Sequence, residues 1–312
     1  MSEFEKKMEQ TKENSGAESK KSYGEIQREK TAELTKKAKA YAKEAVKTVP
    51  SFKNLLNTVS AFTRLSENNI MLIASQHTGA TKLESFGNWQ KQEGFIKKGA
   101  KGIHIIGSKD FIGKDGEKHH VFFDDCRFDI SDVDKVKVPE KRTYDQKELM
   151  KALVHSAAAK IKVDPDYPDD KSDGAYYDPQ KNEIHCQYGM TFGDMFTSVA
   201  KAIAHSEISE ADAHYRNSDG EFYARSVAYT LAKKYDVSTN LCEISSIPAE
   251  FQSMDCEQAH DEVCRIINYT KKIDGRMSEV LDRPKQKNKE HSEEKEISKE
   301  KEESDKDKED AR

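Results

Sequence analysis

Apolar residues recur at helical spacing in the first half of the chain. Between residues 52 and 62 they return every three or four positions, which predicts one buried helix face: Phe52, Leu55, Leu56, Val59 and Phe62. Ser66 precedes a second apolar run, and Ser85 precedes a shorter one around Trp89. Because serine hydroxyls accept hydrogen bonds from free amide groups at helix starts, we expect each serine to cap a helix.

A β-hairpin is expected after these helices. The sequence GIHIIG at 102–107 predicts one strand, and HHVFF at 119–123 predicts the returning strand. Between them, KDG at 114–116 is typical of a hairpin turn. We therefore expect residues 50–132 to form a small α+β domain of helices plus a β-hairpin.

The second half of the chain predicts mostly helices. Leu149, Leu153 and Ala157 mark one helix, and the sequences GAYYD and NEIHC predict a short strand pair. Helical patterns then return in three segments: 191–211, 220–235 and 255–273. We expect residues 144–282 to form a second, mainly helical domain, joined to the first by a polar, proline-containing linker at 133–143.

Both ends of the chain are charged and poor in large apolar residues. Residues 1–49 are rich in Lys, Glu and Ala, and Tyr23–Val49 within them predicts a solvated, frayed helix with weak contacts from Leu34 and several alanines. Residues 283–312 hold ten Lys or Arg and eleven Asp or Glu. Such a segment buries too little apolar surface to offset chain entropy, so we expect a disordered tail.

The cysteines and the hydropathy of the chain indicate the cellular compartment. The five cysteines form no C-x-x-C pair, which argues against a disulfide framework and against a thiolate zinc site. The first residues lack the apolar stretch of a signal peptide, and no run approaches 18 apolar residues. We expect a soluble, reduced, cytoplasmic protein with no membrane partner.

Charge is distributed unevenly along a chain whose net charge is −5. Val46–Lys109 holds nine Lys or Arg against three acidic residues, an asymmetry typical of a surface that binds a polyanion. Its candidate DNA-binding residues supply phosphate contacts and one stacking ring: Arg64, Asn69, Trp89, Lys97, Lys98 and Lys101. Asn69 is a candidate either to position a helix end or to hydrogen-bond a phosphate. The alternative is that Trp89 belongs to the core and that the KKGAKG turn is merely solvated.

The order of these motifs resembles the N-terminal domain of ArdC-type antirestriction proteins, which plasmids and integrative conjugative elements carry. The similarity extends over about eighty residues and rests on several matches in order: Phe62, Ser66, Asn69, Gln76, Ala80, Thr81, Trp89, Lys97–Gly99, Lys101, Gly102 and Phe128–Ser131. The resemblance implies a single-stranded DNA-binding domain followed by a zincin-like metallopeptidase domain.

The metal motif of such a peptidase is altered in this chain. The resemblance implies H-E-x-x-H on one helix and an acidic third ligand on the next. In the register His205-Ser206-Glu207-Ile208-Ser209, His205 is the first ligand, Ser206 replaces the general base, and Ser209 replaces the second histidine. Arg225 occupies the acidic position, and Glu221, one turn earlier, is not expected to be equivalent. Other nearby acids and imidazoles do not restore the site: Glu207, Glu210, Asp212 and His214.

We therefore expect a non-enzymatic, non-sequence-specific single-stranded DNA-binding protein of a bacterial mobile element. Its predicted role is antirestriction or DNA protection during conjugative transfer, with a pseudopeptidase domain, a vestigial His205, no metal and no cofactor. Two alternatives stay open. One is a metallopeptidase with rearranged ligands, and the other is a protein-interaction module that binds a partner through residues 144–282.

Overall fold

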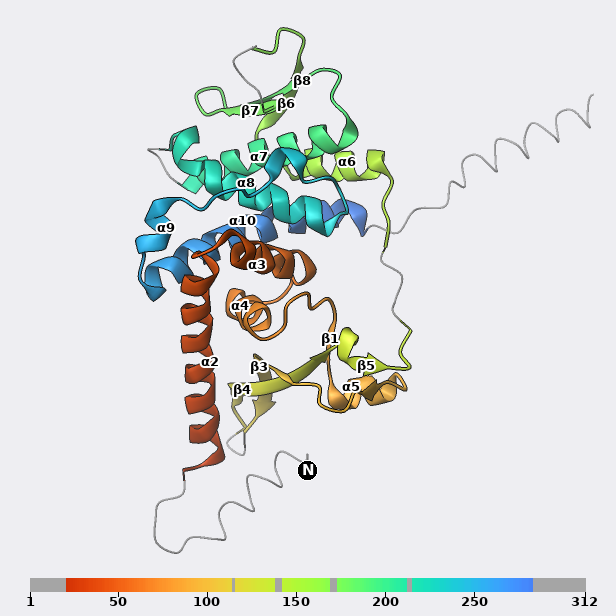
Figure 1. Cartoon of the computed structure of the whole chain (residues 1–312), viewed down its shortest axis with the longest axis vertical. Helices are drawn as coiled ribbons and strands as arrows, with labels where there is room; N and C mark the ends of the chain where they lie inside the picture. The colour runs from red at the N-terminus through yellow and green to blue at the C-terminus, as the bar shows by residue number, and fades with distance from the viewer. Residues whose placement is uncertain (1–20, 114–115, 138–141, 169–172, 212–214, 283–312) are drawn as a thin grey trace, which may run out of the picture.

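A computed structural model describes most of the chain, in five segments: 21–113, 116–137, 142–168, 173–211 and 215–282. Helices dominate these segments and the strands form small sheets, so the predicted α+β class is confirmed (Figure 1). The two terminal tails and the first two residues of the predicted KDG turn lie outside the described residues. None of the helices described is long and apolar enough to cross a membrane.

The elements follow the predicted order of helices, hairpin and helices. They are α2 (Tyr23–Ala45), α3 (Val49–Ala61), α4 (Glu67–Gln76), β1 (Leu83–Ser85), α5 (Phe86–Lys91), β2 (Phe95–Ile96), β3 (Ile103–Ile112), β4 (Lys118–Asp129), β5 (Val133–Asp134), α6 (Gln146–Ser156), β6 (Lys160–Asp164), β7 (Ala175–Asp178), β8 (Glu183–Gln187), α7 (Phe192–Ala211), α8 (Asn217–Lys234), α9 (Ala249–Ser253) and α10 (Cys256–Leu281).

Helix α2 is an integral part of the fold. Ser22 and Glu25 form a capping box at its start, which stabilises the first turn. Its buried face is built almost wholly from small residues, which allow close packing against α4 and α10: Leu34, Ala38, Ala42 and Ala45. The prediction of a helix here is confirmed, but the expectation of a solvated, frayed helix with only weak contacts is wrong, because small alanine side chains gave only a weak apolar signal.

The serine caps expected from sequence are both present. Ser66 accepts a hydrogen bond from the backbone amide of Asn69 at the start of α4. Ser85 accepts one from the amide of Asn88 at the start of α5. The hairpin is also confirmed, since β3 and β4 pair antiparallel and β1 extends the sheet on the far side of β4.

Two amide side chains of α4 bind the outer edge of β3. The Asn69 side chain accepts from the Ile106 amide at 2.8 Å and donates to the Ile106 carbonyl at 2.9 Å. Gln76 makes the same pair of bonds with His104, at 3.0 and 2.9 Å. These bonds join α4 to the hairpin and satisfy backbone groups that β4 cannot reach.

The second half is organised around α7, whose middle turns are enclosed on every side. Helices α6, α8 and α10 pack against it, and the sheet β6-β8-β7 lies at the opposite end of the molecule from the hairpin (Figure 1). The predicted pair GAYYD and NEIHC is confirmed as β7 and β8, which pair antiparallel. Strand β6, which runs parallel to β8, was not predicted.

The two halves share one apolar core. The rings of Phe52 in α3 and Phe222 in α8 stack with centroids 5.1 Å apart. Lys271 in α10 bonds both the Leu65 carbonyl, at 3.0 Å, and the Glu67 carboxylate, at 2.7 Å. The boundary predicted at residues 133–143 stays a prediction.

The Asn69 contacts predict a stability effect. Asn69→Ala leaves the amide and carbonyl of Ile106 without these partners, and we expect the free energy of unfolding to fall by about 2–3 kcal/mol. Urea denaturation measures the change, with Gln90→Ala, at an exposed position, as the control. A loss no greater than that of the control would show that the contact with β3 contributes little.

Candidate nucleic-acid interface and candidate metal centre

The KKGAKG segment forms a tight turn between β2 and β3. The Ala100 amide donates to the Lys97 carbonyl at 3.1 Å, and Gly99 has a φ of +89°. A positive φ at the third position of a turn is the geometry that favours glycine, and it places Lys98 at the tip. The turn is anchored because β2 pairs with β5 and the Lys97 amide donates to the Asp132 carbonyl at 2.9 Å.

The four predicted phosphate contacts differ in how free they are. Lys98 and Lys101 are exposed and make no ion pair or hydrogen bond with the described residues. Lys97 donates to the Ser131 carbonyl at 2.7 Å and lies 4.0 Å from a carboxylate oxygen of Asp134. Arg64 precedes α4, away from the turn in sequence, and its side chain is 85% exposed. Arg64 lies 3.3 Å from Asp282, so of the four cations only Lys98 and Lys101 have no acidic or hydrogen-bonding partner in the part of the chain that the structure describes.

Trp89 does not provide a stacking surface. Its relative exposure is 0%, and its indole nitrogen donates to the Phe128 carbonyl at 2.9 Å. The prediction of an exposed stacking ring is wrong, because the ring fills the space between α5 and the end of β4. Asn69 is also buried and bound to β3, so the phosphate contact proposed for it is wrong as well.

Two phenylalanines near Trp89 in the sequence do have exposed rings. Phe95 is 59% exposed and Phe86 is 52% exposed. The Lys135 ammonium lies 4.9 Å from the centroid of the Phe95 ring, which adds a further cation to this surface. Alternation along β2 is the signal that could have identified Phe95, but a two-residue strand is too short to show a period.

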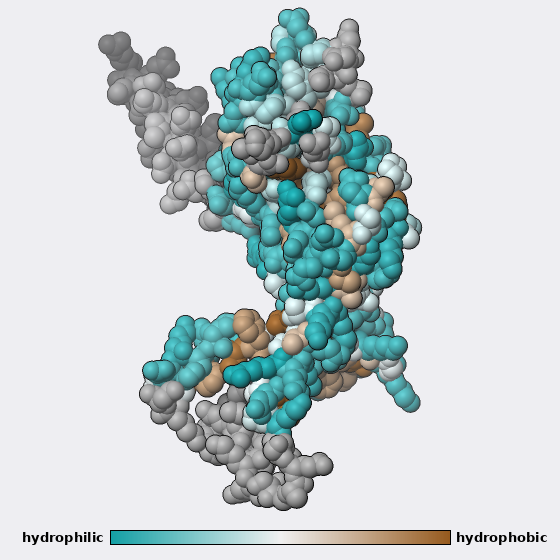
Figure 2. Space-filling view, turned by 90° about the vertical axis from the view of Figure 1, so that its left-hand side faces the viewer, coloured by the Kyte–Doolittle hydropathy of each residue, from teal (hydrophilic) through white to brown (hydrophobic). Residues whose placement is uncertain are grey.

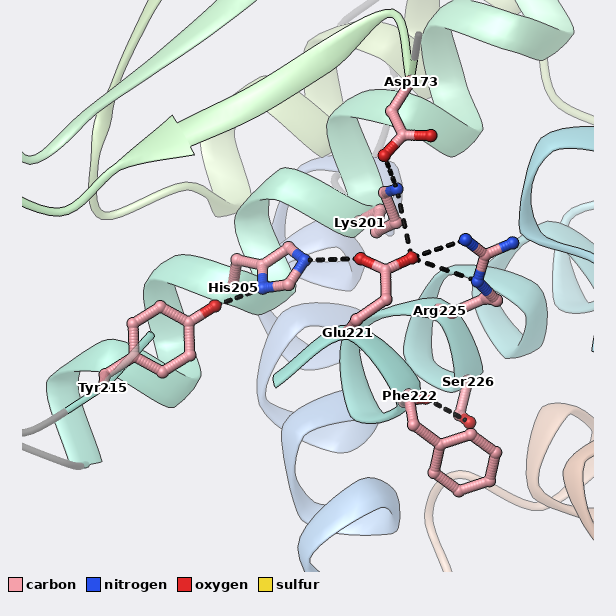
Figure 3. Close-up of polar contacts among 8 residues, drawn as sticks. All are labelled: Asp173, Lys201, His205, Tyr215, Glu221, Phe222, Arg225 and Ser226. Atoms are coloured by element: carbon pink, nitrogen blue, oxygen red, sulfur yellow. Dashed lines mark hydrogen bonds and ion pairs between the residues drawn. The ribbon is translucent and has the colours of Figure 1, made fainter. Parts of the chain in front are cut away.

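The region expected to hold a metal instead holds an ion-pair cluster (Figure 3). Glu221 in α8 lies at its centre. One carboxylate oxygen is 3.2 Å from His205 Nε2, and the other is 3.4 Å from Lys201 Nζ and 2.5 Å from Arg225 Nη2. Lys201 also lies 2.6 Å from Asp173, and Nδ1 of His205 contacts the Tyr215 hydroxyl.

This geometry shows which neighbour of His205 meets the acidic side chain of α8, while the register expected for the metal motif stays a prediction. Lys201, four positions before His205, and Ser209, four positions after it, both lie on the His205 side of α7. Of the two, Lys201 pairs with Glu221. The acidic side chain opposite them is that of Glu221, one turn before Arg225. At this face an imidazole and an ammonium group therefore meet one carboxylate.

The neighbouring polar side chains are also engaged. The Ser206 hydroxyl donates to the Ile203 carbonyl at 2.7 Å, within α7. The Glu207 side chain is fully buried and is paired with Lys272 and Arg276 of α10. Neither side chain is therefore placed to act as a base near His205.

The donor set does not fit a divalent metal ion. One imidazole and one carboxylate meet two side-chain cations, which repel a metal and occupy the carboxylate oxygens. Burial alone would raise the pKa of Glu221, but bonding to His205, the Lys201 charge and the Arg225 hydrogen bond outweigh it and lower the pKa to about 2. Within the described residues no group of three or more His, Cys, Asp or Glu side chains is arranged to hold a metal; Asp212 and His214 lie outside them.

Comparison with known proteins finds matches among solved structures. No protein-family model matches the sequence, and no curated protein matches it. Among solved structures, the metal-free antirestriction protein ArdC from plasmid R388 matches at 15% identity and a TM-score of 0.43, covering 69% of this chain and 83% of that one. Its Mn(II)-bound structure matches at 14% identity with the same coverage and TM-score. The resemblance predicted from sequence is thus accompanied by a similarity of structure, which does not say what this chain binds.

Replacing the two cations predicts a gain of metal binding. Lys201→His combined with Arg225→Ala gives two imidazoles and one carboxylate facing one another, the donor set of a His₂Glu zinc centre. We expect this variant to bind about one equivalent of Co(II) or Zn(II) and the unaltered chain to bind none, by isothermal titration calorimetry. One equivalent of metal in the unaltered chain would contradict the ion-pair interpretation.

The Glu221 carboxylate predicts a pH dependence. Its pKa in the folded state lies below the ordinary value of 4.5, so its ionised form stabilises the fold above that pH. This contribution is lost as the pH falls from 4.5 toward 2. We expect Glu221→Gln to lower the free energy of unfolding by about 2 kcal/mol at pH 7, between the values for surface and buried pairs because the carboxylate is partly exposed.

Denaturation curves from pH 7 to pH 3 measure this effect. The difference between Glu221→Gln and the unaltered chain should shrink in the acidic part of the range. A difference that stays constant with pH would show that the loss comes from packing and not from the charge.

Proposed function

We propose that this chain binds single-stranded DNA with little sequence preference through the surface around the turn at Lys97–Ala100. The observation that carries the proposal is the pair Lys98 and Lys101, exposed and unpartnered within the described residues, in the same segment as the exposed Phe95 ring. We call Phe95, Lys98, Lys101 and Lys135 the basic turn surface.

Each part of the basic turn surface has a separate role in the proposed mechanism. The lysines neutralise phosphates and release condensed counterions, which makes binding weaken with salt. The Phe95 ring stacks on a base, and this favours single strands because bases within a duplex are already stacked on one another. Gly99 keeps the turn tight, so that Lys98 stays at its tip.

The biological role in this proposal is antirestriction or protection of DNA during conjugative transfer of a mobile element. The ordered motif matches to ArdC-type proteins support it. Residues 144–282 act as a pseudopeptidase domain in this proposal, supported by a His205 region in which lysine and arginine surround Glu221. Binding of a protein partner through residues 144–282 stays a prediction, as does the cytoplasmic location.

Removing the two free lysines tests the phosphate contacts. We expect Lys98→Ala with Lys101→Ala to weaken binding to a labelled oligothymidylate about tenfold and to reduce the salt slope by about 1.4, that is by two single-strand phosphate contacts. Fluorescence anisotropy across a salt series measures both quantities. The matched control is Lys147→Ala with Lys151→Ala, which removes two exposed lysines of α6. Equal losses of affinity in the two double variants would show that binding depends on non-specific charge attraction and not on the lysines at the turn.

The exposed ring has its own prediction. Phe95→Ala should weaken single-strand binding by about 1–3 kcal/mol, the contribution of one stacked base, with little change in the salt slope. Phe95→Tyr, which keeps an aromatic face, should bind like the unaltered chain. If the alanine variant binds equally well, Phe95 does not stack on DNA.

A further inference from the structure

A second groove lies apart from the basic turn surface. It is an open groove lined by α2, the start of α4 and the β3–β4 hairpin, with a volume of about 640 Å³. Figure 2, which views the molecule from the α2 side, shows this face hollowed in its lower half, with a brown hydrophobic patch beside hydrophilic surface. The volume is in the range of pockets that hold small organic ligands.

The charged side chains of the groove are all cationic. Arg28 and Arg64 line it, and no acidic side chain is among the described residues that do so. Arg28 is exposed, and its guanidinium makes no ion pair or hydrogen bond with the described residues. Arg64 has one acidic neighbour, Asp282, at 3.3 Å, and Asp282 also bonds Arg142 at 3.0 Å. Glu67, just beyond the groove, is neutralised by Lys271.

One wall of the groove is aromatic and its remaining surface is partly apolar. Phe122 of β4 is 55% exposed, and the edge contact with His120, at 4.8 Å between centroids, helps to hold the ring. Leu65 and Ile106 add apolar surface. The hydroxyls of Thr31 and Thr35 already donate to backbone carbonyls, at 3.1 and 2.9 Å, so they are left as acceptors for amino groups such as those of bases.

The geometry points to a second contact site for single-stranded nucleic acid in this groove, with Arg28 and Arg64 on phosphates and Phe122 stacked on a base. This inference rests on the proposed function and extends it, because the bound strand would have to reach beyond the turn. Lys101 lies just before β3 and Ser108 lines the groove, seven residues further along the chain. At an extended rise of about 3.3 Å per residue, the two sites are roughly 20 Å apart along β3. One oligonucleotide of moderate length can therefore occupy both.

The test uses the full chain and a labelled fifteen-nucleotide oligothymidylate. Arg28→Ala with Phe122→Ala should weaken binding about tenfold and lower the salt slope by about 0.7, for one lost phosphate contact. The matched control is Lys36→Ala with Phe111→Ala, which removes an exposed lysine of the same helix and a ring on the opposite face of the hairpin. Circular dichroism and thermal melting show that each variant is folded.

The outcomes separate the two proposals. If only the groove variant and the Lys98/Lys101 variant lose affinity, both sites bind the strand. If the Lys98/Lys101 variant loses affinity and the groove variant matches its control, the groove inference is overturned while the proposed function stands. If the unaltered chain binds no oligonucleotide at low salt, both proposals fall.

Discussion

The burial of α7 is the constraint on which the second half of the molecule depends. A helix enclosed on every side can carry charged residues only if each of them meets a partner, because an unpaired buried charge is severely destabilising. Lys201, His205 and Glu207 are all buried in α7. Lys201 and His205 are satisfied by Glu221 of α8, and Glu207 by two cations of α10. The helix packing and the charge pairing are therefore one requirement, which ties α7 to two of its neighbouring helices, α8 and α10.

The same pairing leaves the Glu221 carboxylate without a free oxygen for a metal ion. A metal centre needs lone pairs directed at an open position, whereas the Glu221 carboxylate is already shared among an imidazole, an ammonium and a guanidinium. The side-chain cations Lys201 and Arg225 supply positive charge at this position, as a metal ion would, but they cannot coordinate water or substrate. In the proposed function this part of the chain is therefore assigned no metal chemistry, and the ligand surface is placed on the exposed lysines and rings of the first half.

Periodicity in the sequence was enough to predict the hairpin and most of the long helices, because their apolar faces recur over several turns. It failed where a choice depended on tertiary packing. His205 has a potential partner four residues away on either side, and only the position of α8 decides for Lys201 over Ser209. Trp89 and Phe95 are both aromatic residues near lysines, and only tertiary packing separates them: the Trp89 indole is buried and bonds the Phe128 carbonyl, whereas Phe95 in β2 is exposed. Motif residues expected to touch DNA, such as Asn69, proved to bind the protein's own backbone.

The amide side chains of Asn69 and Gln76 have a consequence for the behaviour of the chain at high concentration. β3 is an edge strand of its sheet, and an unprotected edge strand is a template for pairing with another molecule. Because the outward backbone groups of His104 and Ile106 are already bonded, the first half of this strand offers no template. A protein with a long protruding hairpin is in this way protected from sheet-to-sheet aggregation at the place where the hairpin joins the body.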